Sequence, residues 1–227
     1  MPRTGQLSER SVQIPPAGLI GDLTIPADAV GVIIFAHGSG SSRLSSRNRF
    51  VASIFQEGKM ATLLLDLLSA EEEQIDLQTR HLRFDIGLLA NRLVQATRWL
   101  ANESSIAGLP AGYFGASTGA AAALVAAAQL PSSTRAVVSR GGRPDLAGEA
   151  LHKVNAPTLL IVGGHDYSVI ELNREALNEL HCEKRLEIVP GATHLFEEPG
   201  TLDQVASLAN TWFHHHLPER FQARSGT

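Results

Sequence analysis

The chain has 227 residues, of which 44% are hydrophobic and 19% are charged, and its formal net charge is −4. This composition is typical of a globular protein, and the negative balance argues against general binding of nucleic acids. Residues 1–5 lack the apolar core of a signal peptide, and the apolar run at residues 120–128 is too short to cross a bilayer. We therefore expect a cytoplasmic protein that does not bind membranes.

We interpret residues 1–227 as a single domain, with edge strands in residues 1–28 and a loose tail at residues 218–227. Within the first part, residues 12–14 and 19–25 flank a Pro-Pro-Ala-Gly turn. Prolines are tolerated at the edge of a sheet, so this pattern predicts an antiparallel pair of edge strands.

Residues 30–35 form a nearly continuous apolar run, which is typical of a buried strand, and they lead into the sequence His-Gly-Ser-Gly at residues 37–40. We expect His37 to brace this loop. Glycines after a strand also occur in dinucleotide-binding proteins, but Arg43 stands where that motif needs its third glycine. A nucleotide-binding protein is therefore a weak alternative.

Two helical signals follow. Ser69 and Glu72 have the spacing of a capping box, so the acidic run that begins at Glu71 is interpreted as a solvated helix start rather than a metal site. Residues 80–100 predict an amphipathic helix with a buried stripe formed by Leu82, Ile86, Leu89, Leu93, Ala96 and Leu100.

The sequence Gly115-Ala116-Ser117-Thr118-Gly119 joins a buried strand at residues 111–116 to an alanine-rich helix. A serine between two glycines at a strand-to-helix turn is the pattern of a nucleophile elbow, which exposes the serine hydroxyl. Ser117 is therefore the predicted nucleophile.

A serine nucleophile needs a histidine to accept its proton and a carboxylate to orient that histidine. Asp166 follows an apolar strand at residues 157–162, and His194 follows a last strand at residues 185–189. The order Ser117, Asp166, His194 is the one that the α/β-hydrolase arrangement requires. Asp145, which also follows a strand, is the alternative acid.

Strands near Ile33, Leu64, Phe114, Val137, Leu160 and Ile188 alternate with helical segments. This alternation predicts an α/β-hydrolase fold with a mostly parallel, doubly wound sheet of about eight strands, helices on both faces and no large lid domain. The oxyanion of a tetrahedral intermediate would then be held by the backbone amides of Thr118 and Ser39, with Gly38 as the alternative to Ser39.

The His37–Gly40 sequence, the elbow around Ser117, Asp166 and His194 together resemble the dienelactone hydrolase family of small α/β hydrolases. The resemblance extends from Val30 to about Leu217. Dienelactone hydrolases proper have cysteine at the elbow, so Ser117 implies a serine esterase rather than a hydrolase of their lactone substrate. The only cysteine, Cys182, lies outside the elbow, and we interpret it as structural.

Arginines gather in the loops that follow strands, where ligands bind in open α/β sheets. Arg43, Arg140 and Arg143 are candidate ligands for an anionic group of the substrate, and the alternative is that they tie loops to nearby aspartates. The histidines at residues 214–216 are consecutive and cannot share one helix face, so we expect no full metal site among them.

The sequence thus predicts hydrolysis of a small, possibly anionic ester or lactone through an acyl-enzyme, without metal or organic cofactor. An acyltransferase or a non-catalytic binding protein on the same fold is the alternative. The expected partner is the small-molecule substrate alone, and the pattern leaves the natural substrate and the oligomeric state open.

Overall fold

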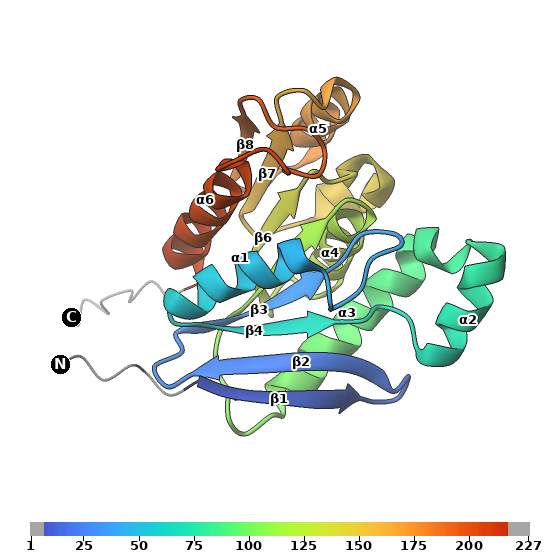
Figure 1. Ribbon diagram of the computed structural model, residues 1–227, viewed down its shortest axis with the longest axis vertical. Helices are drawn as coiled ribbons and strands as arrows, with labels where there is room; N and C mark the ends of the chain where they lie inside the picture. The colour runs from blue at the N-terminus through green and yellow to red at the C-terminus, as the bar shows by residue number, and fades with distance from the viewer. Residues whose placement is uncertain (1–6, 218–227) are drawn as a thin grey trace, which may run out of the picture.

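A computed structural model describes residues 7–217 and places one eight-stranded sheet at the centre of the molecule (Figure 1). The strands are β1 (Leu7–Ile14), β2 (Leu19–Pro26), β3 (Gly31–Ala36), β4 (Met60–Leu65), β5 (Ala111–Ala116), β6 (Thr134–Arg140), β7 (Thr158–Gly163) and β8 (Lys184–Val189). Their order is β1-β2-β4-β3-β5-β6-β7-β8. The pairs β1–β2 and β2–β4 are antiparallel and the others are parallel, which confirms the predicted fold class.

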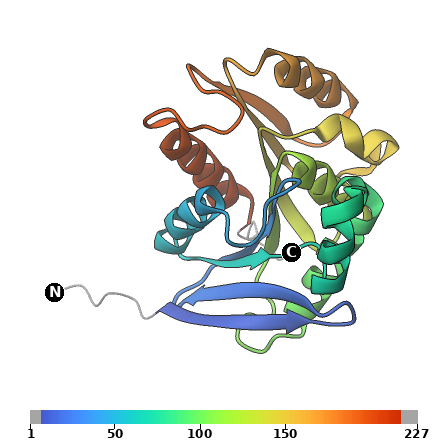
Figure 2. The ribbon, with the colours of Figure 1, turned by 45° about the vertical axis from the view of Figure 1, so that its right-hand side comes forward.

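Helices cover both faces of this sheet (Figure 2). They are α1 (Ser46–Glu57), α2 (Ala70–Thr79), α3 (Ile86–Ala101), α4 (Thr118–Gln129), α5 (Tyr167–Glu179) and α6 (Thr201–His216), with 3₁₀ segments η1 (Leu82–Phe84) and η2 (Pro144–Lys153). Alternate residues of a strand point to opposite faces. In β3, Ile33 and Phe35 pack with Phe55 of α1 and Phe213 of α6, whereas Val32 and Ile34 belong to the core under α3 and α4.

The predicted edge pair is present, but it is larger than expected, since β1 starts at Leu7 rather than residue 12. Strand β1 lies at the edge, while β2 is covered on its other side by β4. The loose tail predicted for residues 218–227 lies outside the described range. Within that range, no helix combines the length and the hydrophobicity needed to cross a membrane.

The prediction that a long helix starts at residue 80 was wrong, because α3 begins only at Ile86. Arg80 has a φ of 56° and ends α2 in the left-handed region, and the Asp85 carboxylate accepts a hydrogen bond from the Leu88 amide at 2.9 Å. Local capping therefore interrupts the apolar periodicity, and Leu82 is half-buried rather than part of the core. The predicted capping box of α2 is confirmed, with Ser69 and Glu72 bonded reciprocally.

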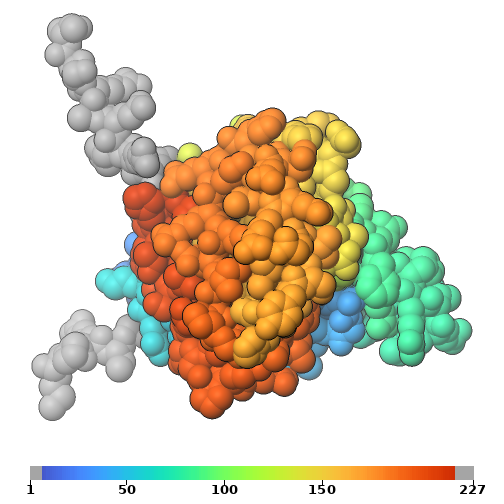
Figure 3. Space-filling model, turned by 90° about the horizontal axis from the view of Figure 1, so that it is seen from above, coloured from blue at the N-terminus to red at the C-terminus, as the bar shows by residue number. Residues whose placement is uncertain are grey.

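Helix α2 packs less closely on the sheet than the other helices do. Seen from the β8 end, the green segment that contains it projects beyond the outline of the molecule (Figure 3). Its residues Ile75 and Leu77 are exposed by 52% and 60%, and Phe84 of η1 by 55%. This projecting segment forms one wall of the cavity described below.

Candidate active site

Ser117 sits at the turn between β5 and α4 with a φ of 51° and a ψ of −123°. Such a conformation is strained for a residue with a side chain and holds the serine out of the helix that follows. Close packing explains the neighbouring glycine, because a Cβ on Gly119 would lie 2.2 Å from the Ala36 carbonyl oxygen. At the predicted elbow, the first turn of α4 therefore packs directly against the end of β3.

Asp166 and His194 meet on the loops that follow β7 and β8. The imidazole Nδ1 lies 2.6 Å from Asp166 Oδ2, and the aspartate side chain is only 13% exposed. The His165 amide also donates to the Ala192 carbonyl oxygen at 2.9 Å, which ties the two loops together. The carboxylate accepts the Nδ1 proton in this arrangement, so Nε2 is left as the proton acceptor.

The imidazole of His194 lies close to Gly141, directly after β6, and Ser117 is bonded to the residue before Gly141. Its Cε1 is 3.6 Å from where a Cβ on Gly141 would stand, and the adjacent Arg140 carbonyl accepts the Ser117 amide at 3.3 Å. Among the described residues, no hydrogen bond joins the Ser117 hydroxyl to His194. Such catalytic hydrogen bonds often tighten only when substrate is bound.

Asp145, the alternative acid, is engaged elsewhere. Arg143 binds it through two parallel hydrogen bonds, Nε to Oδ1 at 2.9 Å and Nη2 to Oδ2 at 2.8 Å. This bidentate hydrogen bonding raises the pKa of Arg143. The structure therefore brings Asp166, not Asp145, to the histidine.

The loop after β3 approaches Ser117 from the other side. A Cβ on Gly38 would lie 3.0 Å from Ser117 Cβ, so this loop borders Ser117. The Ser39 amide, our candidate oxyanion donor, donates to Thr118 Oγ1 at 2.9 Å. The two predicted donor residues are thus linked through the threonine hydroxyl.

His37 holds this loop in place. Its Nδ1 donates to the Gly38 carbonyl oxygen at 3.0 Å, and its Nε2 accepts from the Leu67 amide at 3.1 Å. Burial lowers the pKa of His37 and keeps the ring neutral, as a ring that both donates and accepts must be. His37 has the bracing role expected from the sequence.

A cavity of about 400 Å³ opens beside the Ser39–Thr118 pair, between the β3 loop and the segment of α2 and η1. Its walls combine leucines with polar groups, among them Ser39, Leu44, Leu67, Leu77, Arg83 and Thr118. Arg83 is fixed there by Asp76, with Nε 2.5 Å from Oδ2. The sequence analysis missed Leu77 and Arg83, and it placed Arg83 inside a helix that begins only at Ile86.

The three candidate arginines differ in their partners. Arg43 is bound to Asp66, with its amide at 2.7 Å and Nη1 at 2.5 Å, and Arg143 is bound to Asp145. Both fit the alternative that they tie loops together. Arg140 differs from them, because it forms no ion pair with a described carboxylate and its Nη1 is buried without a hydrogen-bond partner in the described part of the chain, whereas the unbonded Nε of Arg43 still lies 3.4 Å from Asp22 Oδ2.

Arg140 ends β6, directly beside the elbow, and is only 8% exposed. Burial, with the nearby charge of Arg47 as a second cause, lowers its pKa to about 10. A buried guanidinium without a counter-ion is unfavourable, so an anion bound next to it would be stabilised.

Glu198 accepts hydrogen bonds from the Thr193 amide at 3.0 Å and the Thr193 hydroxyl at 2.7 Å, which fastens the loop that carries His194. These hydrogen bonds lower the pKa of Glu198.

Cys182 lies near Thr158, and burial raises the pKa of its thiol, in agreement with a structural role.

The geometry can be set beside known proteins. Residues 20–216 match the dienelactone hydrolase family. The chain belongs to this family. The crystal structure of a dienelactone hydrolase from Anabaena variabilis ATCC 29413 is 60% identical in sequence, with a TM-score of 0.91, and the match covers 95% of this chain and 100% of that one. The predicted resemblance is confirmed.

More distant structures share the fold. Est1E from Butyrivibrio proteoclasticus is 14% identical with a TM-score of 0.74, and the match covers 90% of this chain and 98% of that one. A protein of Mycobacterium tuberculosis that carries the name "Putative phosphoribosyl transferase" is 57% identical over 213 residues, which are 93% of this chain but 47% of that protein. The chain therefore spans about half the length of this relative.

The family match and the shared fold together support hydrolase activity.

Proposed function

We propose that this dienelactone hydrolase family member is a serine hydrolase that cleaves a carboxylic ester or lactone of a small molecule. The observation that carries the proposal is the 2.6 Å contact between His194 Nδ1 and Asp166 Oδ2, on loops at the same carboxyl-end edge of the sheet as the strained Ser117. A nucleophile, a base and an orienting acid in this order support acyl transfer through an acyl-enzyme.

In the first half-reaction, Ser117 Oγ attacks the carbonyl carbon while His194 Nε2 accepts its proton. The Thr118 amide stabilises the oxyanion together with the Ser39 amide, which exchanges its hydrogen bond to Thr118 Oγ1 for one to the oxyanion. Collapse of the intermediate breaks the bond to the leaving alkoxide, which takes the proton from His194. Water then attacks the acyl-enzyme by the same route and releases the acid, with Asp166 stabilising the imidazolium each time.

We further propose that the substrate carries an anionic group, which Arg140 binds. Support comes from the buried guanidinium beside the elbow and from the separate partners of Arg43 and Arg143. The cavity beside Ser39 and Thr118 would receive the less polar part of the substrate, since leucines form much of its wall.

The decisive test is hydrolysis of p-nitrophenyl acetate and butyrate by the wild type and by Ser117→Ala, with folding checked by circular dichroism. We expect activity and fluorophosphonate labelling in the wild type alone. Equal activity in both proteins would refute the serine mechanism. Adding alcohols as competing acceptors distinguishes hydrolysis from acyl transfer, because a transferase would give mainly the new ester.

The substrate class is tested with a pair of esters that differ only by a carboxylate on the acyl chain. We expect Arg140→Met to raise KM for the anionic ester about 10- to 100-fold and to leave the neutral ester nearly unchanged, as for loss of one charge-assisted contact. Arg143→Met is the matched control and should discriminate as the wild type does. Equal effects on both esters in Arg140→Met would exclude this role.

The name phosphoribosyl transferase belongs to a relative about twice as long as this chain. The shared segment contains Ser117, Asp166 and His194, whose chemistry is that of acyl transfer. We therefore propose ester hydrolysis for this segment, whatever reaction the longer protein performs.

A further inference from the structure

The end of α6 meets the start of β8 at a cluster that the proposed hydrolase mechanism does not use. Glu183 immediately precedes β8, and His215 and His216 form the last turn of α6. One ligand atom from each residue lies within 4.8 Å of the other two. The cluster is at the amino ends of the parallel strands, whereas Ser117, Asp166 and His194 follow carboxyl ends.

The contact between His216 and Glu183 has an unusual length. Nε2 of His216 is 3.6 Å from Oε1 of Glu183, which exceeds the roughly 2.7–2.9 Å of a charge-assisted hydrogen bond. Two ligand atoms that each lie about 2.1 Å from a tetrahedral zinc ion are about 3.4 Å apart. The spacing is therefore close to that of two ligands sharing one ion.

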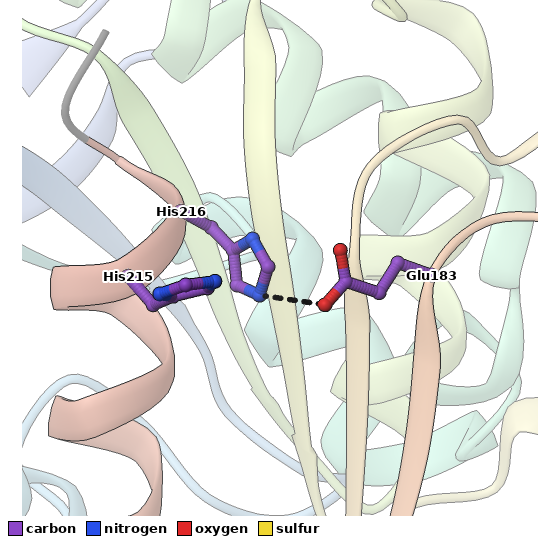
Figure 4. Close-up of side chains that lie close together, drawn as sticks. All are labelled: Glu183, His215 and His216. Atoms are coloured by element: carbon purple, nitrogen blue, oxygen red, sulfur yellow. Dashed lines mark ion pairs between the residues drawn. The ribbon is translucent and has the colours of Figure 1, made fainter. Parts of the chain in front are cut away.

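The rings are also held in suitable positions. The indole of Trp212 packs on the His216 ring with centroids 4.3 Å apart, and its Nε1 donates to the Pro157 carbonyl oxygen at 3.3 Å. The rings of His215 and His216 are 4.6 Å apart and nearly perpendicular. Figure 4 shows the His216 ring between His215 and the Glu183 carboxylate. A ligand atom of the exposed His215 lies within 4.8 Å of those of His216 and Glu183, so three ligand atoms gather at one place.

We propose that Glu183, His215 and His216 bind one divalent transition-metal ion of the zinc type, with water as the fourth ligand. Two imidazoles and a carboxylate suit such borderline ions better than magnesium or calcium, which prefer oxygen ligands alone. The ion would link the last turn of α6 to the segment before β8 and stabilise the folded state, because it binds a geometry that the unfolded chain lacks.

This site differs from the one that the sequence analysis rejected. Consecutive histidines do not share a helix face, and His214 indeed turns toward α1, with its Nε2 3.0 Å from where a Cβ on Gly58 would stand. The third ligand, Glu183, comes from a distant part of the chain. His214 therefore provides a matched control on the same helix.

The experiment uses the full chain after treatment with a chelator, titrated with Zn²⁺ by calorimetry and with Co²⁺ by visible absorption. We expect one ion per chain, the intense d–d bands of four-coordinate cobalt, and an increase in Tm with Zn²⁺. His215→Ala and Glu183→Gln should weaken binding at least tenfold and abolish the Tm increase, whereas His214→Ala should do neither.

Three results would overturn the proposal: no binding by the wild type, unchanged binding in both ligand variants, or an equal loss in His214→Ala, which would indicate non-specific binding to exposed imidazoles. The variants change only exposed side chains, and the buried His216 is left intact, so the variants should fold. Because the site lies away from Ser117, none of these outcomes bears on the hydrolase proposal.

Discussion

The two flanks of Ser117 are built on different principles. On the side of the β3 loop, the polar groups that border Ser117 are paired within the chain: His37 is bonded to Gly38 and Leu67, and the Ser39 amide to Thr118. On the side of β6, the buried guanidinium of Arg140 has a nitrogen without a partner among the described residues. The first flank is a frame of satisfied hydrogen bonds, while the second keeps an unpartnered guanidinium nitrogen, to which we propose that an anion binds.

The difference between the two flanks shows which residues stabilise the fold and which residues destabilise it but remain available to a ligand. A paired polar group in a buried loop supports the fold, and its removal leaves the partner unsatisfied. An unpaired buried charge opposes the fold, and such a residue is retained where a ligand makes use of it. Variants on the two flanks should therefore change stability in opposite directions.

The largest effect is expected at Asp166. Asp166→Asn should lower kcat about 10³- to 10⁴-fold with little change in folding, because an amide can stabilise the wrong imidazole tautomer. The measurement is steady-state hydrolysis of the substrate found in the ester screen. Asp145→Asn is the control, since Asp145 is bound to Arg143, and full activity in Asp166→Asn would remove Asp166 from the mechanism.

The sharpest test of the comparison is the stability of Arg140→Met. Methionine keeps the apolar packing of the arginine stem and removes the buried charge, so we expect the free energy of unfolding to rise by about 1–4 kcal/mol. Urea denaturation of Arg140→Met, Arg143→Met and the wild type measures it. A lower stability of Arg140→Met than of the wild type would mean that the guanidinium is already satisfied, and the anion proposal would lose its basis.

Thr118 tests the frame on the first flank. Thr118→Val keeps the branched shape but removes the acceptor of the Ser39 amide, so we expect kcat to fall about tenfold at nearly constant KM, less than for the loss of an oxyanion donor itself. Thr118→Ser should retain most activity. A higher kcat in Thr118→Val would instead show that the threonine hydroxyl competes with the oxyanion for the Ser39 amide.

Much of the fold and of the candidate site could be predicted from the sequence because the signals are local. The central strands are continuous apolar runs, and the residues Ser117, Asp166 and His194 each follow such a run. Parallel strands bring their carboxyl ends to one edge, so local patterns sufficed to group these residues.

Other features depend on long-range pairing and could not be predicted. Arg43, Arg140 and Arg143 look alike in the sequence, yet only the register that pairs Arg140 with Ala116 and Ile161 places its side chain in the core without a carboxylate. The apolar periodicity likewise predicted that the helix α3 includes Leu82. The spacing of apolar residues does not show that Asp85 caps the helix and sets its start at Ile86. Glu183 and His215 are brought together only by the packing of α6.

The smallest expected effect concerns His37 and the dependence of stability on pH. Because burial holds the folded-state pKa of His37 below 6.5, the unfolded state binds the proton first as the pH falls, and stability is lost below about pH 6.5. His37→Gln should be less stable at neutral pH, since it cannot reproduce both hydrogen bonds, but it lacks this acid-dependent loss. Urea denaturation at about pH 7.5 and pH 5.5 should show the gap between wild type and variant narrowing in acid, by at most about 1.4 kcal/mol. A gap that stays constant or widens would mean that His37 is protonated in the folded state, which the Leu67 amide donating to its Nε2 does not permit.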